Sequence, residues 1–99
     1  VGTPHWMAPE ILGAAENYDT KVDIWAVGIT AIELAEMQPP HADSTSVYAT
    51  MMRIVQGPPA KLRESTAASG SFRDFVGQTL VKDPAARPSA SALLGHIFV

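Results

Sequence analysis

The chain has 99 residues, of which 46% are hydrophobic and 17% are charged, so it can bury a core but has room for only one small domain. Seven basic and ten acidic side chains give a net charge of -3 without a block of like charge, which argues against electrostatic binding of nucleic acid. The absence of cysteine excludes disulfides and thiolate chemistry, and it favours a cytoplasmic location.

The most apolar stretch runs from Ile24 to Leu34 and has Asp23 and Glu33 at its ends. It is far shorter than the roughly 20 residues that a membrane-spanning helix needs, so we expect a buried helix and no membrane contact. The first residue is Val1 and no signal-peptide pattern follows it. We therefore expect the sequence to start within a longer protein.

The first half of the chain predicts two helices. A proline-containing loop leads into a short helix that starts near Pro9 and ends near Gly13, and a connecting loop follows as far as Asp19. A long helix is expected from Thr20, whose hydroxyl would cap it as in a capping box, to a point before Pro39. Because this helix is apolar on nearly all sides, the pattern indicates a helix surrounded by protein.

A third helix is predicted after Ser44 or Thr45, either of which can cap it, and it ends at Gly57. Its expected inward residues recur at helical spacing. They are Val47, Met51, Ile54 and Val55. The segment from Lys61 to Gly70 is rich in small and polar residues and is predicted to be a loop.

Two further helices are predicted near the C-terminus. The fourth carries apolar residues at helical spacing from Phe72 to Leu80 and is broken at Asp83. The fifth opens near Ser89 and ends in an apolar face that includes Ile97 and Phe98. No segment alternates with a period of two, so the pattern predicts an all-α fold of about five short helices.

Five motifs in order resemble a protein kinase domain, from the end of its activation segment onward. The first motif contains Ala8, Pro9 and Glu10, the A-P-E signature of kinases. The others resemble the D-x-W-x-x-G at the start of the kinase αF helix, the loop before αG, the loop between αH and αI, and the closing H-x-F. They lie at residues 23–28, 39–40, 83–88 and 96–98.

The resemblance is strongest to sterile-twenty-like kinases of the germinal-centre-kinase branch, which are serine/threonine-specific. It implies that residues 1–99 form the lower half of a kinase C-lobe, with a short αEF, a buried αF, αG, αH and αI. The sequence contains no G-x-G-x-x-G, no catalytic-loop H-R-D-x-x-x-x-N and no D-F-G. The N-lobe and all catalytic residues would thus lie in the rest of the parent kinase, which would also bind ATP and magnesium. This chain alone would bind no cofactor and would be inactive.

The resemblance also implies roles for individual residues. Thr3 would order the catalytic loop of the parent, whereas without the set of motifs its hydroxyl would be expected to cap local backbone. A substrate-binding segment would comprise Gly2, Thr3, Pro4, Trp6 and Met7. A structural set would comprise Glu10, Asp23, Trp25, Gly28 and Arg87, with a buried ion pair between Glu10 and Arg87. For Asp23, capping of its own helix and anchoring of the catalytic loop can both hold.

Other features carry weaker expectations. His5, His41 and His96 are scattered without a carboxylate or second histidine at ligand spacing, so no metal site is expected. The side chains of Tyr48, Met51 and Met52 could form a docking face for substrates or regulators, although such a stripe is more often ordinary core. Expected partners are protein substrates and the missing N-terminal part of the kinase domain. The alternative function is a pseudokinase or scaffold that binds proteins without turnover.

Overall fold

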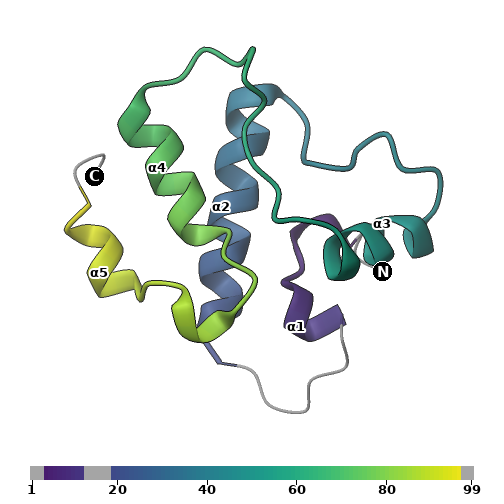
Figure 1. The fold of residues 1–99 in the computed structure, drawn as a ribbon, viewed down its shortest axis with the longest axis horizontal. Coiled ribbons are helices and arrows are strands. Elements are labelled where there is room, and N and C mark those ends of the chain that lie inside the picture. The colour runs from purple at the N-terminus through teal and green to yellow at the C-terminus, as the bar shows by residue number, and fades with distance from the viewer. Residues whose placement is uncertain (1–3, 13–18, 97–99) are drawn as a thin grey trace.

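The computed structural model describes residues 4–12 and 19–96, and within these ranges it is all-helical, without a strand (Figure 1). The prediction of an all-α chain with about five helices is confirmed. The predicted loop over residues 13–18 and the apolar Ile97 and Phe98 lie outside the described residues. The elements are η1 (Pro4–Trp6), α1 (Pro9–Leu12), α2 (Lys21–Glu36), α3 (Val47–Gln56), α4 (Gly70–Thr79), η2 (Pro84–Ala86) and α5 (Ala90–Leu94).

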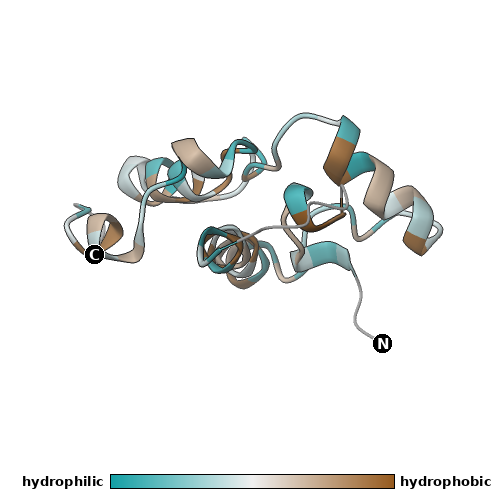
Figure 2. Cartoon of the chain, turned by 90° about the horizontal axis from the view of Figure 1, so that it is seen from below, coloured by the Kyte–Doolittle hydropathy of each residue, from teal (hydrophilic) through white to brown (hydrophobic). Residues whose placement is uncertain are grey.

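Helix α2 is the centre of the fold. Helix α4 packs along one side of α2, and η1 packs against α2 on the other side (Figures 1 and 2). Both η1 and α1 contact α3. The main core joins Trp25, Ile29 and Ile32 of α2 to side chains of the other elements. These are Ala8, Ile54, Leu62, Val76 and Leu80. A second cluster of Ile24, Phe75 and Leu93 attaches α5 to the α2 and α4 pair.

The start of α2 differs from the prediction. Thr20 precedes the helix as expected, but its side chain makes no capping hydrogen bond and its backbone is already helical, so the predicted capping box is wrong. The carboxylate of Asp19 instead accepts the backbone N–H of Lys21 at 2.9 Å. An Asp one position earlier therefore satisfies a free N–H at the helix start.

One face of α2 is open to solvent in this chain. Val27 is 45% exposed and Leu34 is 77% exposed, and Met37, which ends the helix in a left-handed conformation, is 89% exposed. Within the described residues α2 is therefore not covered on all sides, and the enclosure that the sequence indicates would need neighbours outside this chain. The buried side is formed by Trp25, Ile29 and Ile32.

Helix α3 also begins later than predicted. Neither Ser44 nor Thr45 caps it, because the hydroxyl of Ser46 accepts the backbone N–H of Ala49 at 3.0 Å. The inward face agrees with the prediction only in part. Ile54 is buried as expected and Met51 and Val55 are half-buried, whereas Val47 is 60% exposed and Thr50, which was not predicted, is buried. The predicted end at Gly57 is correct.

The C-terminal elements follow the predicted order. Phe75, Val76, Thr79 and Leu80 are buried as the spacing indicated. Ser69 and Ser89 accept the N–H groups that begin α4 and α5, and Asp83 does the same for the short turn η2. This turn directs Arg87 back toward α1 and α2.

Candidate functional site

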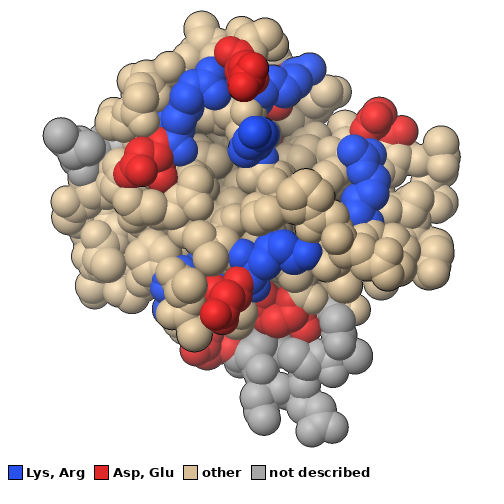
Figure 3. Space-filling model, viewed as in Figure 1, with Lys and Arg blue, Asp and Glu red and all other residues tan. Residues whose placement is uncertain are grey.

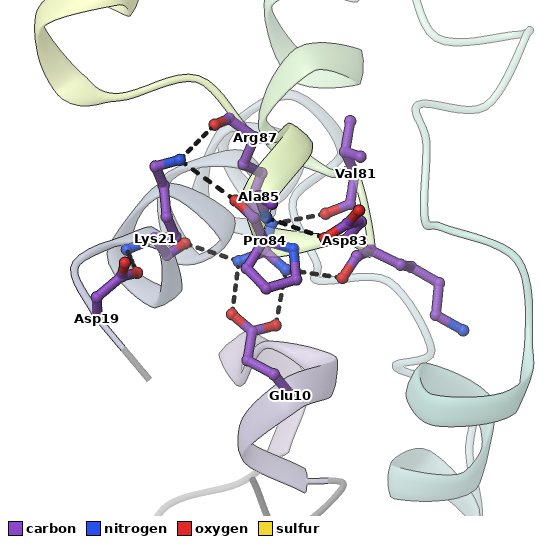
Figure 4. A network of polar contacts seen from close by, with 9 residues as sticks. Glu10, Asp19, Lys21, Val81, Asp83, Pro84, Ala85 and Arg87 are labelled. Atoms are coloured by element: carbon purple, nitrogen blue, oxygen red, sulfur yellow. Dashed lines mark hydrogen bonds and ion pairs between the residues drawn. The ribbon is translucent and has the colours of Figure 1, made fainter. Parts of the chain in front are cut away.

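Arg87 is the centre of the site, and its side chain is completely buried. Its Nη1 donates to Glu10 Oε2 at 2.8 Å and its Nη2 donates to Glu10 Oε1 at 2.7 Å (Figure 4). The expected ion pair between the first motif and the loop before α5 is therefore present. The parallel arrangement suits arginine, whose planar fork matches the two oxygens of a carboxylate.

The other N–H groups of Arg87 also have acceptors. Nε donates to Val81 O at 2.6 Å, Nη1 to Lys21 O at 2.8 Å, and Nη2 to Lys82 O at 3.2 Å. The guanidinium carbon lies 5.2 Å from the centre of the Trp25 ring, which adds a cation–π contact. All five donors are satisfied, so the desolvation of this charge is offset.

Two lysines extend the arrangement to the neighbouring elements. Lys21 Nζ donates to Pro84 O at 3.2 Å and to Arg87 O at 2.7 Å, which ties the start of α2 to η2. Lys82 Nζ donates to Val55 O at 2.6 Å and to Gly57 O at 2.8 Å, at the end of α3. We call Glu10, Lys21, Trp25, Lys82 and Arg87 the arginine node. It joins α1, α2, α3 and the segment before α5.

The expected substrate segment leads directly into this node. Gly2 and Thr3 lie outside the described residues. Pro4 is buried in η1, Trp6 packs against the core, and Met7 is 37% exposed. The described part of the segment therefore has a fixed base at α1, which carries Glu10.

The remaining members of the structural set lie on α2. Asp23 is exposed and makes no side-chain hydrogen bond within residues 4–12 and 19–96. Trp25 is 2% exposed, and its Nε1 has no acceptor in the described part of the chain. Gly28 is a close-approach position, since a Cβ there would overlap Thr79 Oγ1 and lie 2.8 Å from Leu80 Cδ2.

The predicted docking residues lie on α3 with unequal exposure. Tyr48 is 71% exposed, whereas Met51 and Met52 are half-buried. Their spacing places them on neighbouring positions of one helix face. A docking role for this face stays a prediction.

Several polar contacts were missed by the sequence reasoning. No spacing rule indicated the lysines of the node, because both bind backbone carbonyls of distant segments. Glu36 was also missed, although it accepts the backbone N–H of Arg63 and the hydroxyl of Thr66, each at 2.7 Å. Burial would raise the pKa of Glu36, but these bonds outweigh that effect and the pKa is lowered.

The expectation about the histidines needs a correction. His96 does have a carboxylate neighbour, since its Nε2 lies 2.7 Å from Asp74 Oδ2 although the two residues are far apart in the sequence. The hydrogen bond from His96 lowers the pKa of Asp74. Within the described ranges, no group of three or more His, Asp or Glu side chains is placed to hold a metal ion.

The sequence of the chain is similar to that of known proteins along its whole length. The protein kinase domain family matches residues 1–99, which is the whole chain. The chain belongs to the protein kinase domain family. It is 46% identical over 99 residues to the serine/threonine-protein kinase dst3 of Dictyostelium discoideum, and 44% identical over 99 residues to dst1 of the same organism. It is also 44% identical over 103 residues to human myosin-IIIa.

These alignments cover all of this chain but little of the relatives. The chain spans 17% of dst3, 13% of dst1 and 6% of myosin-IIIa. The dst kinases are sterile-twenty-like, so the resemblance noted from the motifs is confirmed. The chain is thus part of a serine/threonine protein kinase domain.

Proposed function

We propose that the protein containing this chain transfers the γ-phosphoryl group of ATP to serine and threonine hydroxyls of other proteins. The observation that carries the proposal is the arginine node, which fixes the A-P-E segment to the body of a chain that matches the kinase family along its whole length. Phosphoryl transfer depends on positioning and charge stabilisation rather than on covalent chemistry, so a rigid support for the substrate is a chemical requirement.

Within that protein, this chain would position the substrate and stabilise the lobe. The segment that ends at Met7 would hold the residues around the acceptor hydroxyl, with Thr3 ordering the catalytic loop. The exposed carboxylate of Asp23 would accept backbone N–H groups of that loop, and it has no competing side-chain hydrogen bond among the described residues. Residues 1–99 would be the part of the kinase domain that follows the catalytic loop and D-F-G.

ATP and magnesium would be held by the remainder of the kinase domain. The present sequence has no glycine-rich loop, catalytic loop or D-F-G, and its described residues contain no group suited to a metal ion. The chain by itself should therefore neither bind nucleotide nor transfer phosphate. No described helix is long and apolar enough to cross a membrane. The proposed location, the cytoplasm, rests on the cysteine content of the sequence.

Steady-state kinetics of the full-length protein test the proposal. We expect phosphate transfer to a serine or threonine peptide and none to the matching tyrosine peptide. Thr3→Ala should lower kcat by about tenfold or more and leave KM for ATP unchanged, because the hydroxyl is assigned to the acceptor side. Thr20→Ala is the matched control, since Thr20 is exposed and its hydroxyl makes no capping bond.

The alternative of a scaffold without turnover gives a different result. A folded full-length protein that binds partner proteins but transfers no phosphate would overturn the kinase proposal. If Thr3→Ala and Thr20→Ala have the same kcat, the protein is still a kinase but Thr3 does not order its catalytic loop.

A further inference from the structure

A hollow of about 760 Å³ lies between the ends of two helices, and one of its lining residues, Gly57, accepts a hydrogen bond from Lys82 of the arginine node. Its walls are the C-terminal end of α2 with the loop that follows, and the C-terminal end of α3 with the segment that follows. Four of its lining residues are prolines. They are Pro39, Pro40, Pro58 and Pro59.

The Lys and Arg residues of the chain fall into two groups, those that bind backbone carbonyls and those that line this hollow. Of the seven Lys and Arg residues, four donate to backbone carbonyl groups. These are Lys21, Arg73, Lys82 and Arg87. The other three, Arg53, Lys61 and Arg63, all line the hollow. In a chain of net charge -3, three cations therefore line one hollow, and two of them are ion-paired, Arg53 with Asp43 and Arg63 with Glu36. On the face that Figure 3 shows, Lys and Arg side chains form several separate groups, most of them beside acidic side chains.

The two carboxylates of the hollow are already engaged. Glu36 is 7% exposed and accepts bonds from Arg63 and Thr66. Asp43 accepts from Arg53 Nη1 at 3.0 Å. Lys61 is exposed and forms no ion pair with any residue that the structure describes. The lining thus carries three cationic side chains against two carboxylates, and Lys61 is the cation without an ion pair among the described residues.

We propose that this hollow binds an acidic peptide segment of a protein substrate. Its proline lining gives apolar contacts for a peptide, and the three cations stand along the walls, where successive carboxylates can reach them. A compact phosphate group fits less well. Compact phosphate sites use several backbone N–H groups, and the four prolines of the lining have none. The C-termini of α2 and α3 disfavour any anion, so the attraction for a peptide has to come from the cationic side chains.

The position of the hollow connects it to the substrate segment. His5 of η1 lies with its Nδ1 3.2 Å from the carbonyl oxygen of Pro40, which lines the hollow. An extended substrate held at the activation segment could therefore continue along this wall. The inference rests on the proposed kinase function, and it adds a preference for acidic residues at a distance from the acceptor hydroxyl.

Direct binding to the full-length protein tests this inference separately from catalysis. The probe is a fluorescent peptide in which Glu alternates with Pro and Ala, compared with the same peptide carrying Gln at every Glu. We expect the Glu peptide to bind more tightly and its affinity to fall as salt rises. Lys61→Gln should weaken binding about fivefold, the size of one exposed charge contact, whereas Lys61→Arg should retain it.

Ser91→Glu is the matched control, because it changes the net charge by the same amount as Lys61→Gln but lies exposed on α5. It should bind the peptide like the unchanged protein. In kinetics, Lys61→Gln should raise KM for a substrate with an acidic extension and leave turnover of a short neutral substrate unchanged. If the unchanged protein does not phosphorylate the short neutral substrate at all, the proposed kinase function is wrong, but the peptide-binding result for the hollow still stands.

Three outcomes would overturn the proposal. The Glu and Gln peptides could bind equally, or Lys61→Gln could bind the Glu peptide as tightly as the unchanged protein does. Inorganic phosphate, or a single-stranded oligonucleotide of equal charge, could compete as well as the Glu peptide. Competition by phosphate or by the oligonucleotide would mean that the hollow is a phosphate or general polyanion site.

Discussion

Arg87 and Glu10 are 77 residues apart in the sequence, yet their side chains form two parallel hydrogen bonds of 2.8 and 2.7 Å. The guanidinium is completely buried and the carboxylate is 11% exposed. A buried pair is not a strong source of stability by itself, because desolvation offsets much of the attraction. Its consequence is that neither partner can be removed without leaving a buried charge unpaired.

The first prediction concerns this pair. Glu10→Ala and Arg87→Ala should each lower the free energy of unfolding of the kinase domain by about 3–5 kcal/mol. The double variant should be much less destabilised than the sum of the two, because the stranded charge is then absent. Arg87→Lys should also destabilise, since one ammonium group cannot reach the acceptors that the guanidinium fork serves. Urea unfolding of the full-length protein measures each value.

A surface pair provides the control. Arg53 and Asp43 also lie 3.0 Å apart, but their side chains are 47% and 83% exposed. Arg53→Ala should therefore change the free energy of unfolding by no more than about 1 kcal/mol. The prediction is wrong if Glu10→Ala and Arg87→Ala each change the free energy of unfolding as little as Arg53→Ala does, and if the effects of the two simply add in the double variant.

A second prediction uses two helical glycines that differ only in their surroundings. In Gly28→Ala the new methyl group would overlap Thr79 Oγ1, which is buried and donates to Val76 O at 2.7 Å. We expect a loss of about 1–3 kcal/mol, since α2 and α4 must move apart. Gly77→Ala meets no atom within 4 Å and should stabilise α4 by about 0.5–1 kcal/mol. Thermal melting of both variants compares them, and equal shifts would contradict the packing argument.

The third prediction concerns the open face of α2. The isolated chain should bind a hydrophobic dye, because Leu34 is 77% exposed, lies near the exposed Met37, and stands two helical turns beyond the exposed Val27 on the same side of α2. Leu34→Gln should reduce the dye fluorescence strongly. Leu94→Gln is the control, since Leu94 is 72% exposed but lies on the short helix α5. Equal decreases for the two variants would argue against a dye site on α2.

Sequence patterns predicted the helices better than their ends. Helix α4 follows directly from its apolar spacing, since Phe75, Val76 and Thr79 are buried as expected. For α3, the sequence predicted a cap at Ser44 or Thr45, but hydroxyl side chains also continue to Ser46, and periodicity does not fix which of them begins the helix. In the structure Ser46 is the cap. The choice depends on the path of the preceding loop, which local spacing does not describe.

The candidate site was predicted only in part for a similar reason. Glu10 and Arg87 could be paired in advance because both belong to motifs of a known family. Lys21 and Lys82 donate to carbonyl oxygens, and any residue type provides such an acceptor. Backbone acceptors leave no mark in the sequence, so contacts of this kind become visible only when the fold brings the segments together.

The last prediction is a pH dependence that originates at His41, which lines the hollow. Burial lowers the pKa of His41, as do the positive charges of Arg53 and His5, while Asp43 acts in the opposite direction. The unfolded chain therefore takes up a proton at a higher pH than the folded chain. Stability should be fully present above pH 6.5, should fall as the pH drops through 6.5 toward the lower pKa of the folded state, and should then level off.

His41→Asn removes the titrating group and suits the backbone, because His41 has a φ of 63° and asparagine tolerates this left-handed region. The variant should lose the part of the pH dependence that lies just below pH 6.5. Asp43→Asn should extend the decline to lower pH, since it removes the one neighbouring charge that favours protonated His41. Urea midpoints collected at intervals across this range measure both effects. Identical pH profiles for the unchanged protein and His41→Asn would show that His41 is as easily protonated in the folded state as in the unfolded one.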